Sequence, residues 1–316
     1  MSKEETFKIL LVGFGRMGVT HLSIISGLLV GKSLEVYVVD NSFASRSLAK
    51  EIIGSVSVFK GLSDVKKRFP DKFFDVCFIT TPPIGRAELV DMADALSKKI
   101  FVEKPLMMML EQNQMSGYVL QHSPLNKSVF DLMSQTDIVT VNARLTTNIS
   151  FASVESGWRS GKFGSVLYEF GGHLLTLIGS TSGRTNFLSN RLDLDALSIS
   201  GVQDDYICFD FVSEGIKYNI ELIAGSADVR KASYEIEYIS KDTCYKYDLY
   251  SLISNAIGVN DGEKIIMNVA STETNVPFYV RGFEFSLQMQ ALLDGKMDVL
   301  SKQQLKNIED IIEGVC

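Results

Sequence analysis

The chain has 316 residues, of which 46% are hydrophobic and 22% charged, the balance of a globular protein long enough for two domains. Its net charge of −7 and isoelectric point near 5.2 argue against a nucleic-acid-binding surface, which normally carries a basic excess. The chain starts with polar residues and has no long apolar stretch, so we expect neither a secretion signal nor a membrane span. We therefore expect a cytoplasmic protein.

The first half alternates short apolar runs with amphipathic stretches, the pattern of a parallel sheet covered by helices on both faces. Strands are expected at Phe7–Val12, Leu34–Val39, Ser55–Phe59, Asp75–Thr80, Ile100–Val102 and Ile138–Val141, and helices at Met17–Leu29, Ala44–Ile52, Asp64–Phe69 and Arg86–Leu96. Pro82 and Pro83 indicate a sharp loop directly after the fourth strand.

Near residue 185 the pattern changes to consecutive strands joined by short turns, which predicts an antiparallel sheet. These strands are expected at Ala196–Ser200, Tyr206–Val212, Lys217–Ala224, Ser233–Ile239 and Thr243–Tyr250. From Phe283 to Ile312 the pattern is helical again, with a break near Asp294 and Gly295. The fold class predicted for the whole chain is therefore an α/β domain followed by an α+β domain with a mainly antiparallel sheet.

Three glycines follow the first strand with the spacing Gly-x-Gly-x-x-Gly, and an apolar helix follows them. In this motif Gly13 permits the tight turn, Gly15 lets the backbone approach a pyrophosphate, and Gly18 packs helix against strand. The intervening Phe14, Arg16 and Met17 belong to the same cofactor-binding loop. The alternative is a glycine turn without a ligand, but the strand before the motif and the helix after it favour a dinucleotide site.

The second strand ends in Asp40, whose carboxylate can accept hydrogen bonds from both hydroxyls of an adenosine ribose. The same negative charge would repel a 2′-phosphate, so we expect NAD(H) to be favoured over NADP(H). Arg46, a few residues further on, can offset that repulsion and leaves NADP(H) open.

A second polar group, Glu103-Lys104-Pro105, stands just past the carboxyl end of a buried strand, the edge at which ligands of open α/β sheets collect. A lysine in such a loop is often only solvated surface. Lys104, however, is held between a strand end and a proline, which favours a ligand-facing role. The cysteines and histidines are too scattered to form a metal signature, so no metal site is expected.

Together these motifs resemble the Gfo/Idh/MocA family of oxidoreductases. The resemblance rests on the loop Gly13–Gly18 with His21, on Thr81-Pro82, and on Glu103-Lys104-Pro105. It continues more loosely at Asn142-x-Arg144, Trp158-Arg159, Gly171-Gly172-His173 and from Phe283 onward. The resemblance implies hydride transfer between nicotinamide and a secondary alcohol or ketone carbon of a sugar, sugar-nucleotide or cyclitol. It also adds Thr80, Thr81, Pro82, Glu103 and Lys104 to the cofactor-binding residues.

The same resemblance implies roles for individual residues. Lys104 would hydrogen-bond the reacting oxygen, and His173 would carry its proton, since imidazole suits proton transfer near neutral pH. Glu169 and Thr176 stand where the family has two aspartates around the histidine. On a helix the residues at 169, 173 and 176 share one face, so the three side chains could converge on one substrate.

The resemblance also implies a domain division and an assembly. A dinucleotide-binding Rossmann domain is expected over residues 1–122, with a final strand and crossover to about 142. An α+β domain over residues 143–316 would serve substrate binding and oligomerisation, and its terminal helical segment can pack back on the first domain. A homodimer or homotetramer through the C-terminal sheet is expected. Tyr234, Ile236 and Tyr238 are candidates for that interface, or alternatively for covering adjacent helices.

Two departures from the family pattern leave other readings open. The segment between Asn142 and His173 is shorter than in the family, and Ser160–Val166 offers a competing alignment in which His173 is not catalytic. Arg86 stands where a histidine is common. The alternatives are a catalytically inactive, dinucleotide-binding regulatory protein of the same fold, and a reductase of C=N or C=C bonds.

Overall fold

The computed structural model describes residues 6–106, 108–124, 126–151, 165–182, 187–188, 197–203, 205–226, 233–241, 243–248, 255–260, 263–268 and 282–315. The chain forms two compact units. Residues 1–117 and 285–298 make the first unit, and residues 118–284 and 299–316 make the second. The chain therefore returns to the first unit after the second sheet is complete.

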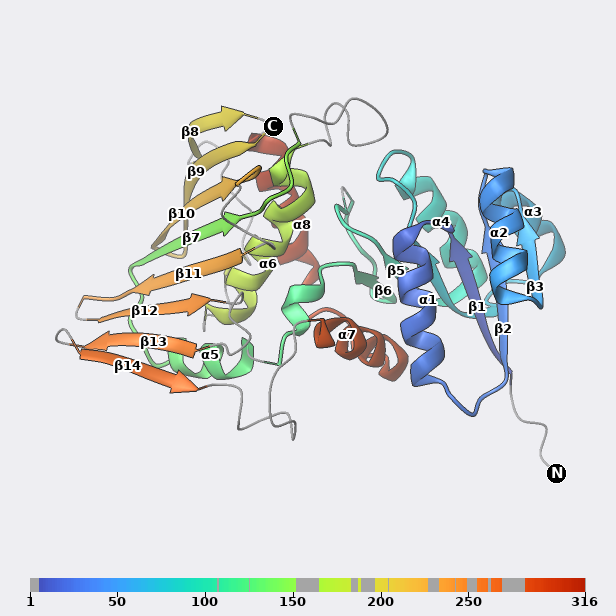
Figure 1. The fold of residues 1–316 in the computed structure, drawn as a ribbon, viewed down its shortest axis with the longest axis horizontal. Coiled ribbons are helices and arrows are strands. Elements are labelled where there is room, and N and C mark those ends of the chain that lie inside the picture. The colour runs from blue at the N-terminus through green and yellow to red at the C-terminus, as the bar shows by residue number, and fades with distance from the viewer. Residues whose placement is uncertain are drawn as a thin grey trace. The chain divides into compact units, whose positions relative to one another are not determined.

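The first unit contains a six-stranded parallel sheet with the strand order β3-β2-β1-β4-β5-β6, flanked by helices (Figure 1). Its strands are β1 (Phe7–Val12), β2 (Leu34–Val39), β3 (Val56–Phe59), β4 (Phe74–Ile79), β5 (Ser97–Val102) and β6 (Gln114–Ser116). Its helices are α1 (Arg16–Leu28), α2 (Phe43–Ile53), α3 (Leu62–Arg68), α4 (Arg86–Leu96) and most of α7 (Phe283–Asp294). From β1 the chain adds β2 and β3 on one side and then β4, β5 and β6 on the other, which is the strand order of the Rossmann fold.

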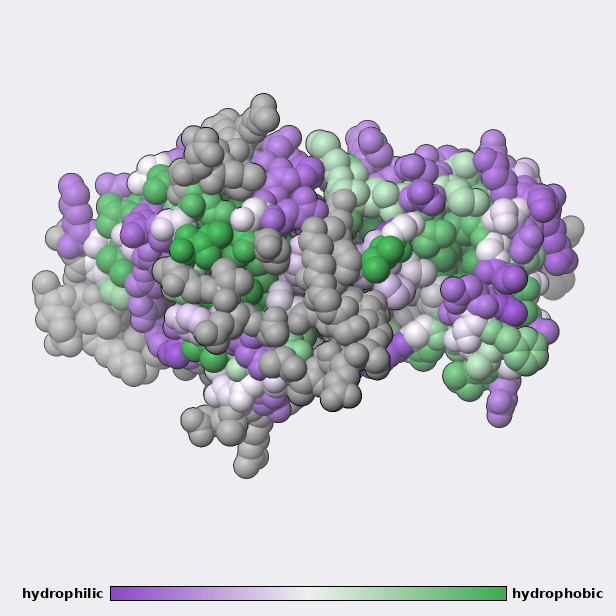
Figure 2. Space-filling view, turned by 90° about the horizontal axis from the view of Figure 1, so that it is seen from above, coloured by the Kyte–Doolittle hydropathy of each residue, from purple (hydrophilic) through white to green (hydrophobic). Residues whose placement is uncertain are grey.

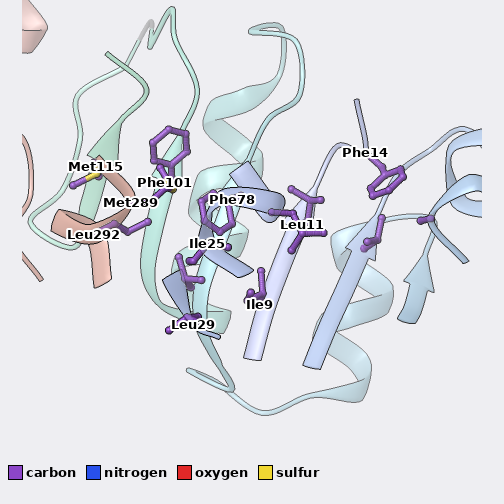
Figure 3. Close-up of a cluster of buried hydrophobic side chains, with 14 residues drawn as sticks. Ile9, Leu11, Phe14, Ile25, Leu29, Phe78, Phe101, Met115, Met289 and Leu292 are labelled. Carbon is purple, nitrogen blue, oxygen red and sulfur yellow. The ribbon is translucent and has the colours of Figure 1, made fainter. Parts of the chain in front are cut away.

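A hydrophobic cluster on one face of this sheet holds α1 in place. Figure 3 shows Ile9 and Leu11 of β1 near Ile25 of α1 and Leu29 directly after it, with side chains of β4 and β5 beside them. The helix α7 completes the cluster through Met289, which is fully buried. Each such buried side chain stabilises the fold by about 1.5–3 kcal/mol, so this face firmly positions the helix that begins at the glycine loop.

Two strands differ from the sequence prediction. The sixth strand of the parallel sheet is Gln114–Ser116, a three-residue strand too short to be recognised from its pattern. The run predicted at Ile138–Val141 is β7 (Thr140–Thr146), which belongs to the second sheet. Only alternate residues of β7 are buried, as in a sheet with one covered face, whereas β4, inside the parallel sheet of the first unit, is buried on both faces.

The second unit contains an eight-stranded sheet with the order β14-β13-β12-β11-β7-β10-β9-β8, antiparallel except for the β7–β10 pair. Its other strands are β8 (Ser198–Gln203), β9 (Tyr206–Ser213), β10 (Ile216–Ile223), β11 (Ser233–Ile239), β12 (Thr243–Asp248), β13 (Asn255–Asn260) and β14 (Glu263–Asn268). Its helical segments are Val119–His122, α5 (Asn126–Met133), a π-helical turn (Leu167–Gly171), α6 (Gly172–Thr181) and α8 (Lys302–Val315). The predicted fold class is confirmed, although β13 and β14 were not predicted.

The two faces of the second sheet differ in chemistry. Tyr234, Ile236 and Tyr238 of β11 are at most 2% exposed, and the hydroxyl of Tyr238 hydrogen-bonds that of Thr181 in α6. These three side chains therefore cover the helices, and the idea that they form a subunit interface is wrong. Glu235 alternates with them along β11 and so lies on the other face, where its carboxylate is 2.7 Å from the ammonium of Lys246 in β12.

Hydrophilic and hydrophobic residues are interspersed over the described surface that Figure 2 shows. In the described parts of the chain, no helix combines the length and the hydrophobicity that crossing a membrane requires.

Candidate dinucleotide-binding and catalytic residues

The glycine loop has the geometry that each of its glycines predicts. Gly13 has a φ of +97°, which favours glycine, and its N–H donates to the carbonyl of Val39 at 2.8 Å. A Cβ at Gly18 would lie 2.3 Å from the carbonyl oxygen of Gly13, so only glycine lets α1 approach β1 this closely. A Cβ at Gly15 would meet no atom of the described chain within 4 Å. The backbone at Gly15 therefore borders open space that a ligand can occupy.

The first turn of α1 presents backbone donors beside that open space. The N-cap is Gly15, which supplies no side-chain hydrogen bond. Arg16 and Met17 follow as the first two helical residues. The N–H groups of a first helical turn have no partner within the helix, and the helix dipole makes them attractive to an anion. A glycine loop followed by a helix start of this kind has the geometry of the pyrophosphate sites found in other α/β proteins.

The carboxylate of Asp40 is fixed beside the glycine loop by two backbone donors. Its Oδ2 accepts from the N–H of Phe14 and its Oδ1 from the N–H of Ser42, both at 2.8 Å. Each carboxylate oxygen can accept a further hydrogen bond, so the group can still bind ribose hydroxyls. The guanidinium of Arg46 donates to the carbonyl of Asp40 at 2.6 Å, which places a positive charge at the same turn.

The loop after β4 packs directly against the glycine loop. The hydroxyl of Thr80 lies 2.7 Å from the carbonyl oxygen of Gly13, to which it donates. A Cβ at Gly13 would come within 3.1 Å of the backbone of Thr80 and Thr81. Thr81 is half-buried and Pro82 is exposed. This loop thus lies on the opposite side of β1 from Asp40, at the same edge of the sheet.

Glu103, at the end of β5, forms a buried pair with His21 of α1. Their nearest atoms, Glu103 Oε1 and His21 Nε2, are 2.6 Å apart, and the two residues are 6% and 1% exposed. Burial alone would raise the pKa of Glu103. The hydrogen bond to His21 and the electrostatic interactions with His21, Lys104 and Arg86 outweigh that effect, so the pKa of Glu103 lies below its ordinary value. Glu103 is therefore the ionised partner in this pair.

Lys104 is half-buried, and a cis peptide bond joins it to Pro105. Its backbone N–H lies 3.1 Å from the Oε2 of Glu103, to which it donates. Gly117 packs against the same turn: a Cβ there would lie 2.8 Å from the Lys104 nitrogen and 2.9 Å from the Glu103 Cα. The backbone of Lys104 is thus held from two sides.

In the second unit, His173 has an unusual place in its helix. Nine of the ten residues of α6 are buried, and His173 is the one that is not. It follows a π-helical turn that contains the half-buried Glu169, and such turns are frequent at functional sites. Thr176 is fully buried and its hydroxyl donates to the carbonyl of His173 at 3.0 Å. The expected convergence of all three side chains on a substrate is therefore wrong for Thr176.

The ring of His173 packs edge-on against Tyr118, with centroids 5.7 Å apart. The hydroxyl of Tyr118 donates to the carboxylate of Glu309, which α8 carries and which is 1% exposed. Neither residue stood out in the sequence, because nothing in its own neighbourhood shows that it lies beside His173.

Solved structures of oxidoreductases share this fold. Levoglucosan dehydrogenase in complex with NADH has a TM-score of 0.75 and 13% identity, with 98% of this chain and 96% of that chain covered. The 3-ketoreductase KijD10 from Actinomadura kijaniata, in complex with TDP-benzene and NADP, has a TM-score of 0.68 and 11% identity over 98% and 97%. An oxidoreductase from Agrobacterium radiobacter in complex with NAD+, L-tartaric acid and magnesium has a TM-score of 0.66 and 12% identity over 97% and 94%.

At these identities the likeness establishes a common two-domain fold, the one that the Gfo/Idh/MocA resemblance implied. No protein-family model and no curated protein sequence matches the chain. The resemblance at Trp158-Arg159, and residues 160–164 of the competing alignment, lie outside the described residues.

Proposed function

We propose that the chain is an NAD(P)-dependent oxidoreductase that transfers a hydride between nicotinamide and a secondary alcohol or ketone carbon. The observation that carries the proposal is the glycine loop, in which Gly13 and Gly18 close the turn while Gly15 borders open space at the start of α1. The fold shared with NADH- and NADP-bound oxidoreductases supports it. The bound dinucleotide would supply the hydride chemistry, and the chain would bind and orient it.

The two halves of the dinucleotide would bind on opposite sides of β1. Asp40 ends the β2 side, where it would accept hydrogen bonds from the adenosine ribose. The backbone of Phe14, Arg16 and Met17 would meet the pyrophosphate. Residues after β4 and β5 would face the nicotinamide half, namely Thr80, Thr81, Pro82, Glu103 and Lys104.

NAD(H) is the cofactor that the Asp40 carboxylate favours, because its charge opposes that of a 2′-phosphate. Arg46 works in the other direction, but its guanidinium is engaged with the carbonyl of Asp40. Titration of the purified protein with NADH and NADPH tests this preference. Tighter binding of NADPH would contradict it, and Asp40→Ser should shift the ratio of the two dissociation constants toward NADPH.

Three side chains would carry the substrate chemistry. Lys104 would donate a hydrogen bond to the reacting oxygen and polarise it. His173 would exchange the proton of that oxygen, which suits a helix residue that stays accessible while its neighbours are buried. Glu169 would orient the imidazole and stabilise its protonated form. No group of His, Cys, Asp and Glu among the described residues is arranged to hold a metal ion.

The substrate class is proposed from the solved structures. One of them is a levoglucosan dehydrogenase, also solved with L-sorbose, another is a 3-ketoreductase bound to TDP-benzene, and a third holds L-tartaric acid. A sugar, a sugar-nucleotide or a cyclitol is therefore the proposed substrate. A cytoplasmic enzyme that forms a homodimer or homotetramer through the outer face of the second sheet is proposed with it.

The experiment is a screen of purified protein with NAD+ and NADP+ against sugars and inositols, with reduced cofactor measured by absorbance. Lys104→Met should keep NADH binding and lose most turnover, about a hundredfold or more. Lys98→Met, which removes an exposed lysine at the far end of β5, is the control and should keep both. Full turnover in Lys104→Met would refute the mechanism, and NADH binding without turnover on any substrate would favour a regulatory protein.

A further inference from the structure

Arg86 is a buried cation that the proposed chemistry does not use. It is the first residue of α4 and only 3% exposed. Its guanidinium donates to three backbone carbonyls, those of Thr81, Glu103 and Pro105. A positive charge at a helix N-terminus opposes the helix dipole, so the helix itself gains nothing from this arginine. Its contacts are instead with two loops at the carboxyl edge of the sheet.

Those contacts complete a ring around the proposed cofactor site, which we call the strand-end ring. The hydroxyl of Thr80 joins the β4 loop to the glycine loop at Gly13. His21 joins the helix that follows the glycine loop to Glu103 at the end of β5. Arg86 joins the ends of β4 and β5. The ends of β1, β4 and β5 are therefore linked pairwise by buried or half-buried polar contacts.

The carboxylate of Glu103 belongs to the same ring, and the positive charge of Arg86 is one of the causes that lower its pKa. A guanidinium keeps its charge at any physiological pH and offers five N–H donors in a rigid plane. The Gfo/Idh/MocA family, which this chain resembles, commonly has a histidine at this position. A histidine has two ring nitrogens and could not donate to three carbonyls. The arginine therefore links these loops through more hydrogen bonds than the residue it replaces could.

We propose that Arg86 is a positioning residue: it fixes the Thr81-Pro82 loop and the backbone of Lys104 relative to each other, and so shapes the nicotinamide half of the cofactor site. The inference rests on the proposed function, because it assigns Arg86 to the dinucleotide site proposed above. The three carbonyls that accept from the guanidinium follow β4 and β5, whereas Asp40, proposed to bind the adenosine half, follows β2. Loss of Arg86 should therefore weaken binding of the nicotinamide half selectively.

The test compares NADH with ADP-ribose, which lacks the nicotinamide, as ligands of the parent protein and Arg86→Ala. The variant should bind NADH about tenfold more weakly, the loss expected when charge-assisted hydrogen bonds that hold a loop are removed, and should bind ADP-ribose within about twofold of the parent. Arg68→Ala is the matched control, because Arg68 is an exposed arginine in the last turn of α3. It should leave both affinities unchanged.

Chemical rescue separates positioning from general damage. Added ethylguanidinium should restore part of the NADH affinity of Arg86→Ala, whereas urea at the same concentration should not. If Arg86→Ala does not fold, Arg86→Lys, which keeps the charge beside Glu103, is compared in the same way and should show the same selective loss. Unchanged NADH affinity, or equal weakening of NADH and ADP-ribose without rescue, would overturn the inference alone. A parent protein that binds neither NADH nor NADPH would overturn the proposed function and the inference together.

Discussion

The imidazole of His21 and the carboxylate of Glu103 lie 2.6 Å apart in the interior of the first unit, although 82 residues separate them in the chain. His21 is one turn into the helix that begins at the glycine loop, and Glu103 precedes Lys104. The pair therefore connects the residues proposed to bind pyrophosphate with the lysine proposed to polarise the substrate. The contribution of this pair to the free energy of unfolding should depend on pH, because one partner is a buried carboxylate.

The first prediction concerns the acid stability that Glu103 contributes. Its pKa is lowered in the folded state, so its contribution is present above the ordinary value of 4.5 and is lost as the pH falls through the lowered value. The free energy of unfolding, measured by urea titration, should therefore fall as the pH drops below about 4.5. Glu103→Gln should remove part of this slope and cost about 3 kcal/mol at neutral pH. Glu51→Gln, at an exposed position in α2, should change neither, and an unaltered slope in Glu103→Gln would contradict the assignment.

The second prediction compares two glycines of α1. Gly18→Ala places a Cβ 2.3 Å from the carbonyl oxygen of Gly13, so the backbone must move, and NADH affinity should fall at least about tenfold. Gly27→Ala adds the same methyl where nothing of the described chain lies within 4 Å. Because alanine favours the helix by about 1 kcal/mol, Gly27→Ala should match or exceed the parent in thermal stability and retain NADH binding. Equal behaviour of the two variants would show that the close approach is unimportant.

The third prediction concerns the hydrogen bond behind His173. Tyr118→Phe takes a donor from the buried carboxylate of Glu309 and should destabilise the protein by about 1–3 kcal/mol. Tyr206→Phe, at an exposed tyrosine of β9, should change the free energy of unfolding by less than about 0.5 kcal/mol. In a double-mutant cycle with Glu309→Gln, the two losses should not add, because the residues share one interaction. Additive losses would show that the pair is not energetically coupled.

The fourth prediction compares adjacent lysines of β5. The ammonium of Lys99 donates to the carbonyls of Leu292 and Leu293 at 3.0 and 2.7 Å, at the C-terminal end of α7. Lys99→Met should cost about 1 kcal/mol, since it removes hydrogen bonds and a favourable charge from a helix end. The side chain of Lys98 pairs with Asp75 and is 56% exposed. Lys98→Met should therefore lower the free energy of unfolding by less than Lys99→Met does. Chemical denaturation of the two variants measures both free energies of unfolding. A larger loss of stability in Lys98→Met than in Lys99→Met would contradict the prediction.

Local features of the chain were sufficient to predict much of the first unit. The glycine spacing, the apolar strand before it and Asp40 at the end of the next strand lie within about 35 residues, and each expresses a backbone requirement that the residue type itself reveals. Strand-like runs separated by short turns likewise predicted β8 to β12 of the second sheet, because turn residues mark where one strand ends and the next begins.

Only the tertiary structure decided which elements meet. It assigned the strand after Ile138 to the second sheet, returned α7 to the first unit, and turned Tyr234, Ile236 and Tyr238 toward the helices. It also buried Arg86 among three carbonyls and paired His21 with Glu103. Periodicity records which face of an element is covered but not by what, since the covering partner is chosen by packing across distant parts of the chain. For that reason the glycine loop could be predicted from the sequence, and the strand-end ring of contacts around it could not.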